Sequence, residues 1–518
     1  MGALALPLQL IKRLAASRRG NVAMMFGLAA VPLAMAVGMG IDITNAMRVR
    51  MSLQDATDSA ALALARQAQT LPPGQAQQLA LDYVNASYGN YGSMAPVSIT
   101  NAAVDGETIT ATVDTKAAVP VFFSRLFGVS TIPVTSHAVA RGLQVEIAMV
   151  LDTSGSMAQA AGSGGAKIAA LKDAADQFLD SLYGDDVASP RVSVSITPFA
   201  SSVNIGPGQR DKGFMDMAGR SSLAYADFND QSRTRWQLFD DLNNSSWAGC
   251  VISRPPGSDL DVSDAAATNS DPDTLYVPWF APDEPDVGGG FSNNYIGDAG
   301  GTCGTQASQI QASAALRQSN TCKYRNATPR SGLGPNYLCD SQALTPLSNS
   351  HPALTNAVAG LKAKGNTNIL EGLVWGWRTI SPNGPFGGAR SYGLANNKKI
   401  IVLMTDGQNN YGGAGNMNMS RYASYGFAAK GELGSATSDN TVLSSRIDDR
   451  TRKACDNVKA KGIIVYTIAF GADAAGSKAL LQSCASDPDY FYAPQNSSDL
   501  KPVFLKIAES IKSLRISE

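Results

Sequence analysis

The feature that most constrains this chain is an uninterrupted apolar run near the N-terminus, from Val22 to Ile41. Its twenty residues, VAMMFGLAAVPLAMAVGMGI, carry no charge and no hydrogen-bonding side chain. A helix rises about 1.5 Å per residue, so the run spans about 30 Å, the thickness of a bilayer's hydrocarbon core. Pro32 is compatible with this, because membrane helices tolerate proline better than soluble ones do. The run predicts a transmembrane helix over residues 21–43.

The charges around this run predict its orientation. Four basic residues precede it, namely Lys12, Arg13, Arg18 and Arg19. By the positive-inside rule, residues 1–20 form a cytoplasmic tail, and the chain after Thr44 is exported. Two alternatives stay open. One is a cleaved signal peptide, whose apolar region normally runs only about 7–15 residues. The other is a buried helix of a soluble domain, which the charge-free length disfavours.

The charge balance limits the classes of partner. The chain has 42 Lys and Arg against 43 Asp and Glu, for a net charge of −1. Nucleic-acid binding through counterion release needs clustered positive charge, so we expect no nucleic-acid partner. With only two histidines, the chain also offers little for a mechanism that needs several imidazoles.

Cysteine usage agrees with export. All six cysteines lie on the predicted outer side, and the even number suits a disulfide framework: Cys250, Cys303, Cys322, Cys339, Cys455 and Cys484. We expect a 455–484 bridge and two bridges among the other four. Six free buried thiols are the alternative, and the sequence does not determine the pairing.

Residues 44–142 predict a small α+β domain. Helices are expected over 44–69 and 75–87, followed by a hairpin over 97–121 around Asp105-Gly106. A short helix at 122–127 and a strand at 132–141 complete the unit. A long apolar helix that carries a small sheet is similar, by analogy alone, to a pilin subunit.

Residues 143–518 predict an α/β domain with a doubly wound, mostly parallel sheet. Unbroken apolar runs indicate strands buried on both faces, and periodic stretches indicate amphipathic helices. The strands are expected at 145–151, 192–196, 400–404 and 463–470, and the helices at 167–183, 354–362, 368–380 and 500–514. Two polar, glycine-rich inserts interrupt the pattern, at about 203–350 and 408–440. Four cysteines and three tryptophans favour an ordered, disulfide-rich subdomain for the first insert, whereas the composition of the second favours mobility.

Three oxygen-rich segments fall where strands or loops of this sheet end. Asp152-Thr153-Ser154-Gly155-Ser156 and Thr405-Asp406-Gly407 each follow a strand directly, and Gly365-Asn366-Thr367 opens a helix. Ligands of a doubly wound sheet bind beyond the carboxyl ends of its strands, so these segments should converge. Their hydroxyls and carboxylates are hard oxygen ligands of the kind that Mg²⁺ prefers. We predict a metal site formed by Asp152, Ser154, Ser156, Thr367 and Asp406, whose two carboxylates contribute a charge of about −2.

The three motifs, in this order and context, resemble the metal-ion-dependent adhesion site of von Willebrand factor type A domains. The resemblance covers about residues 143–518. It implies hydroxyl ligation by Ser154, Ser156 and Thr367, and a direct or water-mediated role for Asp152 and Asp406. It also implies Mg²⁺, or another divalent cation such as Ca²⁺ or Mn²⁺. The insert at 203–350 is large for that family.

The N-terminal part resembles a second family. Residues 18–66 are similar to the TadE/TadG-like segment of tight-adherence (Flp) pilus-assembly proteins, as are the run GNTNILEGLVWGWRTI and the C-terminal YTIAF…LLQSCAS pattern. Processed pseudopilins carry Glu five residues after the cleavage glycine, whereas Met25 stands at that distance from Gly20. A retained anchor is therefore expected. The resemblance implies a single-pass envelope protein of the bacterial inner membrane, with most of the chain periplasmic or extracellular.

Together these features predict a non-enzymatic pilus-assembly or adhesion protein that binds an acidic group of a protein partner, such as another pilus or envelope component, through the metal. No catalytic residues are assigned, because Ser154 lacks the G-x-S-x-G context of a hydrolase nucleophile. Two alternatives stay open. One is a periplasmic enzyme that acts through the disulfide-rich insert, and the other is a structural domain with a non-functional metal site.

Overall fold

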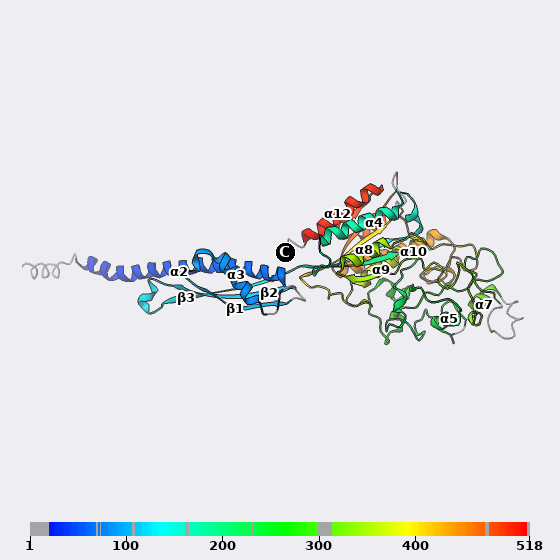
Figure 1. Cartoon of the computed structure of the whole chain (residues 1–518), viewed down its shortest axis with the longest axis horizontal. Coiled ribbons are helices and arrows are strands. Elements are labelled where there is room, and N and C mark those ends of the chain that lie inside the picture. The colour runs from blue at the N-terminus through cyan, green and yellow to red at the C-terminus, as the bar shows by residue number, and fades with distance from the viewer. Residues whose placement is uncertain are drawn as a thin grey trace, which may run out of the picture. The chain divides into compact units, whose positions relative to one another are not determined.

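The computed structural model describes two compact units, which meet in the sequence at Gly142 and Leu143 (Figure 1). Its described residues are 20–68, 71–72, 74–105, 109–160, 165–229, 231–298, 313–471 and 476–514. The predicted cytoplasmic tail at 1–20 lies outside them, apart from its last residue.

The first unit combines a long helix with a small antiparallel sheet. Its helices are α2 (Gly20–Gln67) and α3 (Ala76–Tyr88), and its strands are β1 (Val97–Asp105), β2 (Thr110–Pro120) and β3 (Thr131–Arg141). The strands pair in the order β1-β2-β3. The predicted transmembrane run and the helix that follows it are thus one continuous helix. The segment predicted as a short helix at 122–127 is only a 3₁₀ turn, η2 (Ser124–Phe127).

The C-terminal half of α2 forms the core of this unit. Small and branched side chains of α2, among them Val49, Leu53 and Leu64, pack with sheet residues such as Val113 and Val134. The N-terminal half has no such cover, and its apolar side chains are exposed. Among the described residues, α2 contains the one helix segment long and apolar enough to cross a membrane. The side chains of α2 thus begin to pack against the sheet where the apolar run ends.

The second unit is built on a six-stranded sheet of order β6-β5-β4-β7-β8-β9. The strands are β4 (Gln144–Asp152), β5 (Val192–Phe199), β6 (Thr345–Ser348), β7 (Asn397–Thr405), β8 (Ile464–Ala469) and β9 (Phe491–Tyr492). The adjacent strands β5, β4, β7, β8 and β9 are parallel. The edge strand β6 pairs antiparallel with β5. The sheet is therefore mixed, with a parallel centre.

Helices cover both faces of this sheet. The helices of the sheet domain are α4 (Lys167–Tyr183), α8 (His351–Ala359), α9 (Ile369–Ile380), α10 (Asn440–Ala460), α11 (Lys478–Cys484) and α12 (Ser497–Leu514). Two shorter helices, α5 (Arg235–Asp241) and α7 (Ala314–Ser319), belong to the first insert. One set of alternating β4 side chains, including Ile147 and Met149, packs with α4, α8 and α12. The other set, including Ala148 and Val150, packs with α9 and α10. Because both faces are buried, the central strands are apolar throughout.

The two inserts are packed against the sheet domain. Trp236, Trp247 and Trp279 of the first insert are buried. The second insert was expected to be mobile, yet Tyr411 and Tyr422 are buried within it. This expectation was wrong because it rested on the glycine and asparagine content, whereas the insert's aromatic side chains enter the core.

Two disulfides are found among the described residues. Cys455–Cys484 confirms the predicted bridge, and Cys250–Cys339 joins distant parts of the first insert. Cys303 lies outside the described residues, so the second bridge predicted within that insert is not described.

Candidate metal centre

The first segment of the site follows β4 directly and is shaped by its own aspartate. The backbone N–H of Ser154 donates to Asp152 Oδ1 at 2.7 Å, which closes a tight turn after the strand. The 3₁₀ turn η3 (Gly155–Ala158) continues from it. The hydroxyls of Ser154 and Ser156 then lie 3.0 Å apart. Both serines therefore present their oxygens from one short turn at the end of the sheet.

The second segment follows β7, the neighbour of β4, and meets the first directly. Ser156 Oγ donates to Asp406 Oδ1 at 2.6 Å, and Thr405 Oγ1 donates to Asp152 Oδ2 at 2.5 Å. These two bonds cross-link the ends of adjacent parallel strands. The structure thus brings four of the five predicted residues into one hydrogen-bonded group.

The fifth residue, Thr367, comes from the loop before α9. A Cβ placed on Gly407 would lie 3.7 Å from Thr367 Oγ1 and 3.8 Å from Ser156 Oγ, so both hydroxyls border the same small space. The loop is held by backbone bonds from Gly155 N to Gly365 O at 2.9 Å and from Asn410 N to Thr367 O at 2.9 Å. All five predicted residues therefore converge at the carboxyl ends of β4 and β7.

The charges of this cluster are buried and unevenly balanced. Asp152 and Asp406 are both 0% exposed. Burial and the nearby negative charge of Asp406 raise the pKa of Asp152 from 3.8 to about 7, although the bonds from Thr405 and Ser154 lower it. No ion pair to Asp152 is found among the described residues. The cluster therefore gains from an added positive charge.

Lys167, the first residue of α4, also enters the site. Its Nζ lies 2.9 Å from Asp406 Oδ2, and its side chain is buried. Our sequence-based charge of −2 did not include this ammonium group. A divalent ion that draws on Asp406 would therefore compete with Lys167 for that carboxylate.

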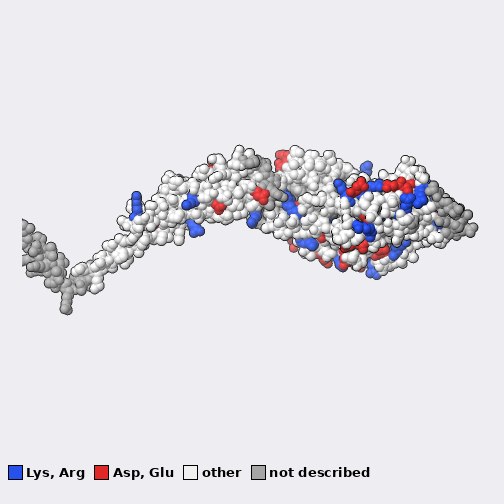
Figure 2. Space-filling model, turned by 90° about the horizontal axis from the view of Figure 1, so that it is seen from below, with Lys and Arg blue, Asp and Glu red and all other residues white. Residues whose placement is uncertain are grey.

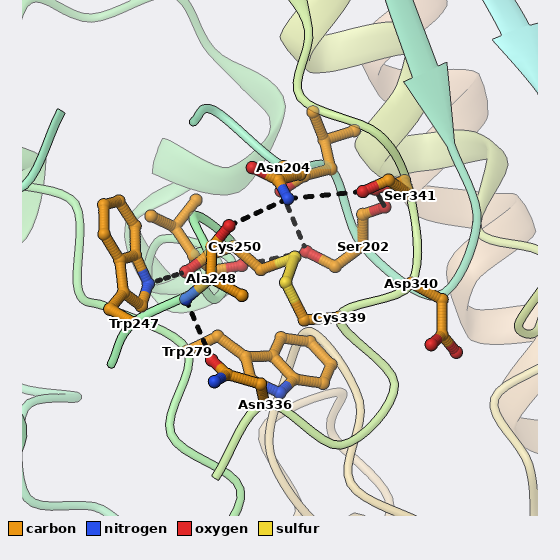
Figure 3. Close-up of a disulfide and its surroundings, with 12 residues drawn as sticks. Ser202, Asn204, Trp247, Ala248, Cys250, Trp279, Asn336, Cys339, Asp340 and Ser341 are labelled. Carbon is orange, nitrogen blue, oxygen red and sulfur yellow. Dashed lines mark hydrogen bonds between the residues drawn. A yellow bond between two sulfur atoms is a disulfide. The ribbon is translucent and has the colours of Figure 1, made fainter. Parts of the chain in front are cut away.

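The first insert reaches the Thr367 loop beside its disulfide, since a Cβ added to Gly365 would lie 3.3 Å from Asp340 Oδ2. Figure 3 shows the surroundings of this disulfide. Cys339 is tied to Cys250, and Asn204 fixes the neighbouring chain by donating to the carbonyls of Ala248 and Ser341. Asp340 points away from the disulfide. Its Oδ1 lies 2.7 Å from Lys364 Nζ, two residues before Asn366 in the Thr367 loop. The disulfide thus steadies the chain that contacts this loop.

A hollow of about 670 Å³ lies beside this contact and is lined largely by the insert. Its wall includes Asn336, Tyr337, Asp340 and Lys364. Gly155 is exposed and Ser156 and Gly407 are partly exposed, so solvent reaches the oxygen cluster past these residues. A partner that reached the cluster at this edge would also meet the insert.

The donor set fits a hard divalent cation. Its three hydroxyls and two carboxylates are all oxygen ligands. They do not fill the octahedral shell of Mg²⁺, so a position remains for water or a further ligand. Among the described residues, no three His, Cys, Asp or Glu side chains gather to hold a metal, so any such ion here depends on the hydroxyls. Ligation by these five residues stays a prediction.

Sequence reasoning missed two contributors to the cluster. Thr405 was identified only as part of a motif, although its hydroxyl holds Asp152. Lys167 was identified only as the start of a helix. The adjacency of Thr405 to Asp406 was a usable signal, but the direction of the Lys167 side chain depends on how α4 packs.

Comparisons with solved structures find similarity to pilus proteins at low sequence identity. The vWF domain of the type V pili tip protein Mfa5 from Porphyromonas gingivalis is 11% identical over 72% of this chain and 97% of that chain, with a TM-score of 0.33. The pilus adhesin SpaC from Lactobacillus rhamnosus GG is 12% identical over 80% of this chain and 34% of that chain, with a TM-score of 0.31. The adhesive tip pilin GBS104 from Group B Streptococcus agalactiae is 11% identical over 72% of this chain and 100% of that chain, with a TM-score of 0.33. These TM-scores are low, so the case for the site rests on its own residues.

One part of the sequence matches a family model. No curated protein matches the chain. Residues 20–67, which are the residues of α2, match the model of the Flp pilus-assembly TadE/G-like family.

Proposed function

We propose that this chain is a membrane-anchored, exported pilus-assembly or adhesion protein that binds an acidic group of a protein partner through a divalent cation. The observation that carries the proposal is the meeting of three oxygen-bearing segments at one end of the sheet. The pilus assignment is supported by the TadE/G-like match of residues 20–67. A membrane anchor is supported by the exposed apolar half of α2, and its location in the inner membrane is part of the proposal.

In this proposal the chain's own residues hold the site ready. Ser154, Ser156 and Thr367 provide hydroxyl ligands, while Asp152 and Asp406 provide negative charge directly or through water. Thr405 and the Ser154 N–H orient Asp152. The bound ion, Mg²⁺ or another divalent cation, supplies an open coordination position that a partner's carboxylate can fill.

The first experiment measures whether the site binds a divalent ion. The full-length protein in detergent is titrated with MgCl₂ by calorimetry, alongside a Thr367→Val variant. This substitution keeps the side-chain shape but removes one predicted ligand, so we expect Mg²⁺ binding to weaken at least about tenfold. Thr441→Val is the matched control, because Thr441 is an exposed threonine on α10.

The second experiment measures whether the ion supports partner capture. Photo-crosslinking in cells, with the crosslinker at exposed Ala158 just after the Ser154–Ser156 turn, should yield an adduct whose formation needs both Mg²⁺ and Thr367. An adduct that forms equally in Thr367→Val or in the presence of a chelator would contradict metal-mediated binding. Failure of the wild type to bind Mg²⁺, Ca²⁺ or Mn²⁺ would refute the metal site itself.

A structural domain that folds without metal is the second candidate. The observation that favours it is the Lys167–Asp406 ion pair, which places a positive charge inside the cluster without any metal. This candidate predicts the same thermal stability with and without each divalent ion.

A further inference from the structure

The loop that joins β2 to β3 displays large apolar side chains to the surroundings. Phe122 is 86% exposed, Leu126 is 72% exposed and Phe127 is 56% exposed. Val129, in the same loop, is also exposed. Single exposed apolar residues are common on soluble domains, but a group of this size within eight residues marks an interaction surface.

This loop is fixed to α2 at the point where the apolar run ends. The buried carboxylate of Asp42 accepts hydrogen bonds from the backbone N–H groups of Phe122 at 3.0 Å, Phe123 at 2.9 Å and Ser124 at 2.7 Å. The Ser124 hydroxyl donates to it as well, at 2.8 Å. Asp42 directly follows Ile41, the last residue of the run. The depth of the loop is therefore set by the end of the predicted membrane span.

Phe123 extends the contact one helical turn toward the span. Its ring lies against Gly38, where an added Cβ would come within 2.4 Å of Phe123 Cγ. Gly38 precedes Asp42 by four residues, which is about 6 Å along a helix. The loop thus packs on the helix at the level where apolar and polar surroundings change.

The charge of the loop suits the surface of a bilayer. Residues 121–130 (VFFSRLFGVS) contain no acidic residue and one basic residue, Arg125. Figure 2 shows that the adjoining stretch of the molecule, next to the grey N-terminal residues, is almost free of charged side chains. Aromatic and aliphatic side chains combined with arginine are typical of segments that lie in the headgroup region.

We propose that residues 121–130 form a second membrane contact, in which Phe122, Leu126 and Phe127 enter the outer headgroup region beside the emerging α2. Two attachments, the helix and the loop, then restrict the tilt of the first unit against the bilayer. The inference requires the membrane span and is independent of the metal site.

The experiment places a fluorescent label in the loop of the full-length protein, reconstituted in phosphatidylcholine–phosphatidylglycerol vesicles. The label is an NBD group on Leu126→Cys, and the described part of the chain has no free cysteine to compete for it. Val31→Cys, inside the predicted span, is the membrane reference. Val139→Cys, which is exposed on β3, is the aqueous reference. We expect the label at 126 to be quenched by doxyl lipid nearly as strongly as the label at 31, and to resist aqueous iodide.

A second variant tests the cause of this depth. Phe122→Ser combined with Phe127→Ser changes two exposed side chains, so the unit should keep its helix and sheet, as circular dichroism would show. The label at 126 should then lose most of its quenching by doxyl lipid. If it does not, the aromatic side chains do not hold the loop in the membrane.

Other outcomes would overturn the inference in distinguishable ways. A label at 126 that behaves like the label at 139 would place the loop in water. A label shielded from iodide, not quenched by lipid and self-quenched at high protein density would show that a second copy of the chain covers the loop. Loss of lipid quenching at 31 would refute the membrane span.

Discussion

Two of the buried groups of charge in the second unit differ in how their charges are matched. In the first insert, Lys323 Nζ lies 2.7 Å from Asp283 Oδ2, and both side chains are 0% exposed. Lys323 also lies 3.6 Å from Asp298, which has Arg317 as a second cation at 3.5 Å, so the charges of this group are matched. The other oxygen of Asp283 accepts from the N–H groups of Tyr295 at 2.6 Å and Ile296 at 2.9 Å. At the end of the sheet, by contrast, Asp152 lies near a second carboxylate, that of Asp406.

Burial acts in the same direction on the two aspartates, but the neighbouring charge shifts their pKa values in opposite directions. Burial raises the pKa of both Asp283 and Asp152. The next largest influence on Asp283 is the attraction of Lys323, which lowers its pKa, whereas the next largest on Asp152 is repulsion by Asp406, which raises it. A buried carboxylate that is paired with a cationic side chain has a structural role. A cation site instead requires more carboxylates than cationic side chains.

The largest effect should come from breaking the matched pair. Lys323→Met leaves Asp283 as a buried, unpaired charge, and we expect the free energy of unfolding to fall by about 3–5 kcal/mol. Urea unfolding followed by tryptophan fluorescence measures this, because all five tryptophans lie in the second unit. Arg452→Met is the control, since its ion pair with Asp449 is exposed and should contribute less than about 1 kcal/mol. Equal effects of the two substitutions would contradict the assignment of the insert pair.

Removing a charge at the end of the sheet should instead increase the free energy of unfolding. Asp152→Asn removes one of two repelling charges but keeps an oxygen that can accept the Ser154 N–H. At pH 8 with a chelator, we expect the free energy of unfolding to rise by roughly 1–3 kcal/mol. In saturating Mg²⁺ the wild type should regain the advantage, because the variant lacks a predicted ligand. Destabilisation of the variant in the chelator would show that Asp152 is a structural carboxylate like Asp283.

The raised pKa of Asp152 also predicts a pH dependence. Its folded pKa of about 7 exceeds the ordinary value of 3.8, so the folded state holds this proton more tightly than the unfolded state. The stabilisation is complete below pH 3.8 and is lost as the pH rises toward about 7, by at most about 1.4 kcal/mol per pH unit.

Unfolding of the wild type and of Asp152→Asn across this range isolates the contribution of Asp152. The free energy of unfolding of the variant should rise relative to that of the wild type as the pH rises, and this difference should level off above about pH 7. Mg²⁺ affinity of the wild type should increase over the same interval, since the ion requires the ionised carboxylate. A difference that does not change with pH would refute the proposed titration.

The elements with a clear hydrophobic pattern could be predicted from the sequence, and those without one could not. The central strands were predictable because β4 and β7 are buried on both faces and so read as apolar runs. Helix α10 was missed, because its sequence, NTVLSSRIDDRTRKACDNVKA, is dominated by polar residues and directly follows a glycine-rich insert. The edge strand β6 and the two-residue β9 carry too few residues for a period to show.

Part of the candidate site could likewise be predicted from the sequence, and part could not. Its five predicted residues stand directly at strand or helix ends, where the position in the sequence sets the position in space. Lys167 and the insert wall could not be predicted, because both reach the site through packing between distant segments. The sequence therefore indicated the oxygen ligands but not the local charge balance.

The smallest expected effect is on metal affinity, and it comes from Lys167. Lys167→Met keeps the length of the buried side chain but removes the ammonium group that lies 2.9 Å from Asp406. With Asp406 released, we expect Mg²⁺ to bind about three- to tenfold more tightly in calorimetry, equivalent to about 0.7–1.4 kcal/mol. Lys172→Met is the matched control, since this lysine of the same helix donates to the Ala359 carbonyl. Unchanged or weaker Mg²⁺ binding in Lys167→Met would mean that the ammonium group supports the cluster rather than competing with the ion, and the sheet end would then resemble the matched pair of the insert.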